Sequence, residues 1–245
     1  MDLNLTGKTA LVFGASQGIG KAIAESLIKE GVKVAICSRT ESTLNETKDK
    51  IGAEFALSGD LTKPNEARRV TEEVIKHFGK LDILVTNTGG PAKNNFPDVT
   101  TEQWQTDFQS IWLSVTESLQ AALPKMAENN YGRVLMVTSI AALEPLPGLT
   151  TSNGLRAGLS GLARSISNEY AANGITLNLL LPGYTATDRL KGLNLSEEKI
   201  KEMVPAGRLG DPSELADMAT FLASEKGAYI TAQSIAVDGG VLKGH

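Results

Sequence analysis

The chain has 245 residues, 41% of them hydrophobic, with a formal net charge of −4 and a single cysteine, Cys37. This length can bury a sizeable core, one cysteine excludes an intramolecular disulfide, and the sequence has no basic run, no signal-peptide start and no apolar stretch of the ~20 residues that a membrane helix needs. We therefore expect a cytoplasmic protein without nucleic-acid or membrane partners, in which Cys37 is a buried strand residue.

Short apolar runs alternate with longer amphipathic segments along the chain. The runs are nearly continuous in Val, Ile and Leu, which is typical of strands buried on both faces of a parallel sheet. Alternation of strand and helix predicts a Rossmann-type doubly wound α/β fold, with about seven strands flanked by helices on both faces. The predicted strands are Thr9–Phe13, Val32–Cys37, Phe55–Leu57, Ile83–Thr86, Val134–Thr138, Thr176–Leu181 and Ser234–Val237.

Helix start and stop signals occur between these strands. Gly31 is placed to end the first helix, and Thr100 with Gln103 is the pattern of a capping box. Pro124 is expected to bend or end the helix that this box opens, and Asp211-Pro212-Ser213-Glu214 marks another start. The predicted helices include Gly18–Lys29, about Thr101–Ala127, about Ser152–Ala172 and one beginning at Asp211.

A glycine-rich segment, Gly14-Ala15-Ser16-Gln17-Gly18-Ile19-Gly20, lies directly between the first predicted strand and the first predicted helix. Glycines at this junction allow a tight turn and a close approach of the backbone to a pyrophosphate, and the helix N-terminus offers free N–H groups to that anion. The segment therefore predicts a dinucleotide site. Its candidate residues are Gly14, Ser16, Gln17, Gly18, Ile19 and Gly20.

The residues after the second predicted strand indicate which dinucleotide binds. NAD-specific sites place a carboxylate there for the ribose 2′-hydroxyl, whereas this chain has Ser38 and Arg39. An arginine can pair with a 2′-phosphate, although Arg39 could instead point into solvent beside Glu41. We predict NADP(H) as the preferred cofactor, with NAD(H) as the alternative and no metal.

Further motifs occur in an order that resembles the short-chain dehydrogenase/reductase family over nearly the whole chain, and in particular its 3-oxoacyl-(acyl-carrier-protein) reductases. After the glycine segment, the matching stretches are Gly59-Asp60-Leu61, Asn87-Thr88-Gly89-Gly90, Pro182-Gly183 with Thr187-Asp188 beyond it, and Val237-Asp238-Gly239-Gly240.

This resemblance implies one dinucleotide-binding domain over residues 1–245 and a small-molecule carbonyl or alcohol as substrate. It also implies a homo-oligomer, in particular a homotetramer that pairs the two long helices across two-fold axes, where Gly154, Ala157, Gly158 and Gly161 would permit close approach. The cofactor contacts that it adds are Asp60, Leu61, Asn87, Thr88, Gly89, Arg156, Pro182, Gly183, Thr185 and Thr187.

The chain departs from the family at three of its four catalytic positions. Ser139 matches the serine that binds the substrate oxygen, but the tyrosine, lysine and asparagine positions hold Ser152, Arg156 and Ile111. A serine hydroxyl is a far weaker acid than a lysine-activated tyrosine, and an arginine is not an ordinary proton donor. The usual proton path is therefore absent, and Ser139, Ser152 and Arg156 remain the candidate catalytic residues.

Three other side chains could border the nicotinamide: Lys93, Glu144 and Tyr184. Each also has a structural interpretation, as a solvated loop charge, a rim acid and a lid aromatic respectively. Three functions stay open at this point. The first is an oxidoreductase with a noncanonical site, the second a catalytically silent NADP(H)-binding sensor or regulatory protein, and the third a lyase or isomerase that uses the nucleotide structurally.

Overall fold

The computed structural model describes residues 2–192 and 195–244, and a parallel sheet of seven strands runs through these residues. Its order, β3-β2-β1-β4-β5-β6-β7, is that of a doubly wound Rossmann-type sheet, as the alternating pattern predicts. The strand bounds agree with the predicted runs to within two residues. They are β1 (Thr9–Phe13), β2 (Lys33–Ser38), β3 (Phe55–Ser58), β4 (Ile83–Asn87), β5 (Gly132–Val137), β6 (Ile175–Pro182) and β7 (Ser234–Val237).

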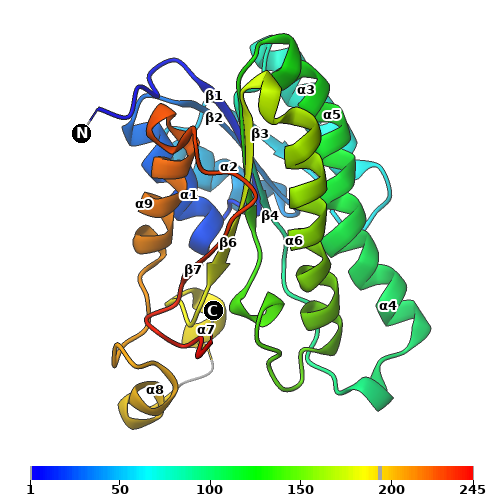
Figure 1. The fold of residues 1–245 in the computed structure, drawn as a ribbon, viewed down its shortest axis with the longest axis vertical. Coiled ribbons are helices and arrows are strands. Elements are labelled where there is room, and N and C mark those ends of the chain that lie inside the picture. Colours follow the sequence, from blue (N-terminus) through cyan, green and yellow to red (C-terminus); the bar gives the residue numbers. More distant parts are fainter. Residues whose placement is uncertain (1, 193–194, 245) are drawn as a thin grey trace.

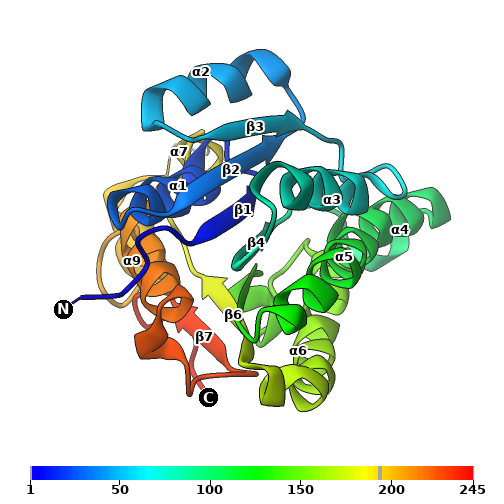
Figure 2. The ribbon, with the colours of Figure 1, turned by 90° about the horizontal axis from the view of Figure 1, so that it is seen from above.

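Helices cover both faces of the sheet, with α1 and α9 on one side and α3, α5 and α6 on the other (Figure 1, Figure 2). Because all strands run in the same direction, every β–α loop that leaves a strand lies at the carboxyl edge, the lower end of the sheet in Figure 1. The helices are α1 (Gly18–Lys29), α2 (Glu41–Ile51), α3 (Glu66–Phe78), α4 (Thr101–Phe108), α5 (Ser114–Glu128), α6 (Thr150–Tyr170), α7 (Asp188–Lys191), α8 (Glu197–Met203) and α9 (Pro212–Ala223).

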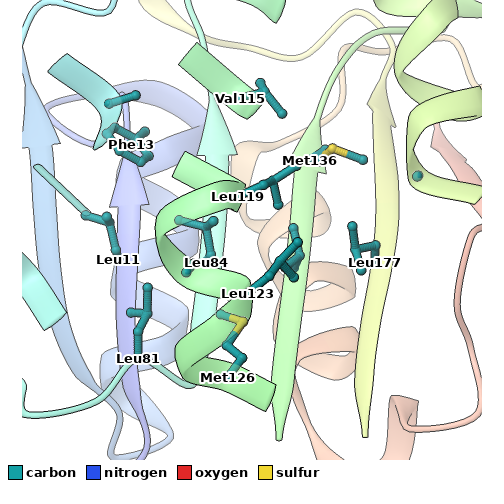
Figure 3. Close-up of a cluster of buried hydrophobic side chains, with 14 of the residues drawn as sticks. Leu11, Phe13, Leu81, Leu84, Val115, Leu119, Leu123, Met126, Met136 and Leu177 are labelled. Atoms are coloured by element: carbon teal, nitrogen blue, oxygen red, sulfur yellow. The ribbon is translucent and has the colours of Figure 1, made fainter. Parts of the chain in front are cut away.

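Two apolar cores separate these helices from the sheet. Figure 3 shows part of the larger one, in which Leu119, Leu123 and Met126 of α5 pack toward Leu84 of β4 and Met136 of β5. Burial of such side chains stabilises the fold by about 1.5–3 kcal/mol each. The cores fix the strands and therefore the positions of the loops at the carboxyl edge.

The segment predicted as one long helix over about Thr101–Ala127 consists of three helical pieces. Between α4 and α5 lies a π-helical segment, Gln109–Leu113, which the periodicity did not reveal. Ser114 N–H bonds to Gln109 C=O across this segment, and the Ser114 hydroxyl donates to Ser110 C=O. π-Helical turns are frequent at functional sites, and this one carries Ile111 at its centre.

The structure bears on the predicted capping box and on the predicted effect of Pro124, which was a bend or an end of the helix. The Thr100 hydroxyl accepts from Gln103 N–H at 3.2 Å, but the Gln103 side chain bonds forward to Asp107, so the reciprocal half of the capping box is missing. Pro124 lies inside α5, which continues to Glu128, so it does not end the helix.

Other local predictions are confirmed. Asp211 and Glu214 form a complete capping box at the start of α9, with Pro212 in the first turn. Cys37 is 1% exposed in β2, and burial raises the pKa of its thiol to about 12.

None of the helices within residues 2–192 and 195–244 has the length and apolar character needed to cross a membrane.

Candidate functional site

The predicted cofactor and catalytic residues lie along the carboxyl edge of the sheet, at the ends of the six neighbouring strands β1 to β6 and in the first turns of α1 and α6. Backbone hydrogen bonds join adjacent loops into one surface. Ala15 N–H donates to Cys37 C=O at 3.1 Å, and Gly59 N–H donates to Ser38 C=O at 3.0 Å. The topology thus brings together segments that are more than 150 residues apart in the sequence.

The glycine segment forms a tight turn between β1 and α1. Gly14 and Gly18 have φ angles of +61° and +57°, a region that favours glycine. A Cβ on Gly14 would lie 2.5 Å from Asn87 C=O, and one on Gly20 would overlap Gly14 C=O. The Asn87 side-chain amide donates to Gly14 C=O at 3.2 Å and holds this turn against the end of β4.

The N-terminus of α1 has the features of an anion site. Its N-cap residue, Gln17, makes no side-chain capping bond, and the first turn contains no acid. Ser16 C=O accepts from the Thr47 hydroxyl of α2 at 2.9 Å, and Ile19 packs into the core. The segment therefore presents backbone rather than side chains, as close approach of a phosphate requires.

At the end of β2, Ser38 has a buried hydroxyl with no hydrogen-bond partner among the described residues. An unsatisfied buried hydroxyl is costly unless a ligand supplies the partner. The neighbouring Arg39 is exposed, and its positive charge acts on Asp60 after β3. Burial raises the pKa of Asp60, but hydrogen bonds from Thr62 and the charges of Lys63 and Arg39 outweigh it and lower the pKa overall. Leu61, next to Asp60, packs against the core.

Arg156 occupies the space between the ends of β4 and β5 and the first turns of α6. It is 4% exposed, and its Nε donates to the Ser152 hydroxyl oxygen at 3.1 Å. One terminal nitrogen donates to Val137 C=O at 3.3 Å and the other to Gly89 C=O at 3.2 Å. All three guanidinium nitrogens thus donate hydrogen bonds to the protein, and the Ser152 hydroxyl is in direct contact with the Arg156 cation.

Ser139 begins the loop after β5. Its hydroxyl oxygen accepts from Ala141 N–H at 3.1 Å, which leaves its O–H free to donate outward as far as the described residues show. Ile111, which we expect at the position of the family's asparagine, is fully buried in the core. It offers no side-chain amide to anchor a water molecule.

The turn after β6 is the last of the site's loops along the carboxyl edge of the sheet. Gly183 packs against Asp238, where a Cβ would lie 2.6 Å from the Asp238 Cα. The Thr187 methyl group approaches Gly18, where a Cβ would lie 3.2 Å from it, so this turn faces the glycine segment. Of the remaining predicted contacts, Thr185 is 7% exposed on the turn itself, with Pro182 at the end of β6 and Thr88 just beyond β4.

The three other side chains expected near the nicotinamide, Lys93, Glu144 and Tyr184, lie in different settings. The Glu144 carboxylate accepts from Lys243 N–H at 2.7 Å and from Gly244 N–H at 3.2 Å, so it holds the C-terminal segment. Tyr184 lines a small cavity with Arg208, and Lys93 is exposed on the loop after β4. These placements match the structural interpretation of Glu144 and Lys93.

The sequence pattern did not single out Asp107, a carboxylate that is 3% exposed on α4. It accepts from the Thr151 hydroxyl at 2.6 Å and from the Gln103 amide at 2.7 Å. The only signal in the sequence is an acid one helical turn before Ile111, and that spacing becomes meaningful only when α6 is seen beside α4.

Comparison with known proteins gives matches over almost the whole chain. The family model described as enoyl-(acyl carrier protein) reductase matches residues 14–242. The 3-oxoacyl-(acyl-carrier-protein) reductase FabG of Vibrio cholerae is 36% identical over 98% of this chain and 99% of its own.

Two solved structures are also similar. L-sorbose reductase of Gluconobacter frateurii, complexed with NADPH and L-sorbose, matches with a TM-score of 0.93 and 29% identity over 100% of both chains. An NADPH-bound short-chain oxidoreductase of Pseudomonas aeruginosa, described as containing an atypical catalytic center, matches with a TM-score of 0.91 and 30% identity over 97% of this chain and 98% of that chain.

Proposed function

The chain belongs to the short-chain dehydrogenase/reductase family of NAD(P)-dependent oxidoreductases, and on this basis we propose that it transfers hydride between NADP(H) and a carbonyl or alcohol substrate at a noncanonical active site. The observation that carries the proposal is the pairing of Ser152 with Arg156 beside Ser139. In our alignment this pair stands where the family has its tyrosine and lysine. The residues that we assign to the cofactor are still present along the carboxyl edge of the sheet.

The residues present fit a dinucleotide. Gly14 and Gly20 leave no room for a side chain, the first turn of α1 has no side-chain cap and no acid, and the buried Ser38 hydroxyl has no partner within residues 2–192 and 195–244. We assign the pyrophosphate to the glycine segment, the 2′-phosphate to Ser38 and Arg39, the adenine to Asp60 and Leu61, and the nicotinamide side to Asn87–Gly89, Arg156 and the turn carrying Pro182, Gly183, Thr185 and Thr187. When bound, the cofactor supplies or accepts the hydride.

Ser139 and Ser152 act as hydrogen-bond donors to the substrate oxygen. Each hydroxyl oxygen already accepts from a protein N–H, from Ala141 and Arg156 respectively, so each O–H proton is available to a ligand. The adjacent guanidinium polarises Ser152 and stabilises negative charge that develops on the substrate oxygen. We assign the proton itself to solvent, because neither serine nor arginine is a workable acid near neutral pH.

This arrangement predicts slow turnover of simple ketones. Loss of a positioned general acid typically lowers the rate by a factor of ~10²–10⁴. The NADPH-bound relative with an atypical catalytic center supports the view that members of this family occur with altered sites. A silent NADP(H)-binding sensor is the second candidate, favoured by the bonds that all three Arg156 nitrogens make to the protein.

Cofactor selectivity is the first test. We expect NADPH to bind more tightly than NADH in a fluorescence titration, and Arg39→Ala to weaken NADPH binding by about tenfold while leaving NADH nearly unaffected. Ser38→Ala should also weaken NADPH binding, yet the melting temperature without cofactor should not fall, because its hydroxyl has no partner to lose among the described residues. Equal affinities for the two cofactors in the unmodified protein would contradict the assignment.

Restoration of the family's residues is the second test. The triple variant Ser152→Tyr, Arg156→Lys and Ile111→Asn should raise the rate of NADPH oxidation with acetoacetyl-coenzyme A, a 3-oxoacyl thioester. Arg156→Lys alone is the matched control, since the lysine then has no tyrosine hydroxyl to activate and the rate should gain little. A folded, NADPH-binding triple variant with no gain would show that the pocket serves different chemistry, and no NADPH oxidation in any variant would favour the sensor.

We further propose that residues 1–245 form a single domain and that the protein is a homotetramer. The single sheet from Thr9 to Val237 supports the first statement. The second is supported by exposed small residues on α6, namely Gly154, Ala157 and Gly161, and by the half-exposed Phe108 of α4, which stacks on the Trp112 ring that lies against Gly158.

A further inference from the structure

The first turn of α6 carries Ser152 but lacks the usual means of holding a helix start. Its N-cap residue, Leu149, offers no side-chain acceptor, and the first turn contains no acid. An uncapped helix start leaves N–H groups without partners and is prone to fray. If Ser152 is to present its hydroxyl at a fixed point, something outside α6 must hold this turn.

Asp107 of α4 is placed to do so. Its carboxylate accepts from the hydroxyl of Thr151, the residue before Ser152, at 2.6 Å, and both partners are 3% exposed. The second carboxylate oxygen accepts from the Gln103 amide at 2.7 Å, which fixes the carboxylate on α4. A negative charge beside a helix N-terminus is also favourable toward the helix dipole.

The bond extends to the catalytic side chains. Thr151, Ser152 and Arg156 are all buried on α6, and Arg156 bonds Ser152 and then the ends of β4 and β5. Asp107 therefore anchors one side of the turn through Thr151, and Arg156 anchors the other through Ser152. The Asn153 side chain adds two bonds to the Leu146 backbone in the loop before α6, so without the first anchor the turn would keep this loop contact and the bond to Arg156 but no link to α4.

We propose that Asp107 is a positioning residue that fixes the first turn of α6 through Thr151 and so sets the place of the Ser152 hydroxyl in the active site. This inference rests on the proposed function, because it gives Asp107 a role in turnover through Ser152. Asp107 itself is not assigned contact with substrate or cofactor.

The first measurement is amide hydrogen exchange in the full chain, comparing Asp107→Asn and Thr151→Val with the unmodified protein. Both variants keep the side-chain volume and remove the charge or the hydroxyl. We expect exchange in residues 150–156 to quicken roughly tenfold, while α1 stays unchanged. The control is Thr106→Val, which removes an exposed α4 hydroxyl bonded only within its own helix, to Glu102 C=O. Unaltered exchange in residues 150–156 of Asp107→Asn would overturn the proposal.

The second measurement separates positioning from mere support of the fold. NADPH affinity should stay within about twofold in Asp107→Asn, whereas single-turnover oxidation of NADPH by acetoacetyl-coenzyme A should slow roughly tenfold. In a Ser152→Ala background the same substitution should cause no further loss, because it acts through Ser152. An equal loss in both backgrounds would overturn the proposal. If the unmodified protein does not oxidise NADPH, the proposed reductase activity on this substrate fails separately, and the exchange result alone decides whether Asp107 holds the turn.

Discussion

Gly20 shows at the scale of one residue how tightly the cofactor loop is built. Its φ angle is not in the left-handed region, so the need for glycine there comes from space alone: a Cβ would overlap Gly14 C=O and lie 2.7 Å from the Asn87 amide nitrogen. The Asn87 amide is the group that holds the loop to β4. An added methyl group must therefore push the loop away from the strand.

We predict that Gly20→Ala lowers NADPH affinity at least tenfold and destabilises the protein by about 1–3 kcal/mol, since overpacking against backbone cannot relax cheaply. The matched control is Gly161→Ala in α6, where no atom lies within 4 Å of the added methyl group. It should leave NADPH binding intact. Fluorescence titration and thermal melting measure both effects, and unchanged NADPH affinity in Gly20→Ala would contradict the role given to the loop.

That the candidate residues share one edge of the sheet could be predicted from the sequence, because the glycine spacing and the strand ends fix which positions lie there. The hydrogen bonds that these side chains make could not be predicted. The pairing of Arg156 with Ser152 is an i, i+4 relation on a helix, but its bonds to Val137 and Gly89 C=O depend on how α6 packs on the sheet. The Asp107 contact likewise depends on packing between α4 and α6, which no local pattern encodes.

At the scale of secondary-structure elements, start signals proved more reliable than the continuity of a helix. The Asp211 box is local and complete, because all its partners lie within three residues. The π-helical segment Gln109–Leu113 could not be predicted, since its altered bonding shifts the periodicity by a single residue inside a long amphipathic run. Its polar groups are satisfied partly by the Ser114 hydroxyl, a bond that only the folded backbone defines.

The start of α9 gives a prediction for stability. Asp211 accepts from Ser213 N–H at 2.8 Å, and Asp211→Ala should destabilise the protein by about 1 kcal/mol, or roughly 2–4 °C in melting temperature. Asp217→Ala is the control, because it removes an exposed acid from the same helix away from its start. A loss in Asp217→Ala equal to that in Asp211→Ala would mean that the cap contributes nothing specific.

The same cap makes stability depend on pH. Hydrogen bonds from Arg208 lower the pKa of Glu214 from 4.5 to about 2, with a further bond from Asp211 N–H. A carboxyl whose pKa is lower in the folded state stabilises the fold above its ordinary pKa and loses that effect as the pH falls. The stability advantage over Glu214→Gln should therefore be full above pH 4.5 and shrink toward pH 2, as thermal melts at several pH values would show.

At the scale of the whole molecule, the sheet gathers the site at one edge and leaves the outer helical layer free for assembly. The exposed residues in the first half of α6 have small side chains, because Gly154, Ala157 and Gly161 carry at most a methyl group. The Trp112 ring fills the space that a side chain at Gly158 would occupy. The half-exposed Phe108 stacks on Trp112, with 6.2 Å between the ring centroids. Small exposed residues beside an exposed aromatic ring would allow a second helix to pack closely on this face.

We predict that light scattering gives a tetramer of the 25.9-kDa chain and that Ala157→Arg reduces it to a dimer or monomer. The arginine would place a long charged side chain where two copies of α6 meet across a two-fold axis, so each interface would receive it twice, with like charges opposed. Asn45→Arg, on the exposed face of α2, adds the same charge away from this surface and should leave the mass unchanged. A monomeric unmodified protein would contradict the assembly, and an intact tetramer in Ala157→Arg would mean that the interface does not include this part of α6.

The same variant tests whether assembly stabilises the first turn of α6, because this helix carries Ser152 and Arg156 on its buried side. If it does, amide exchange in residues 150–156 should be faster in a folded, dissociated Ala157→Arg variant than in the tetramer.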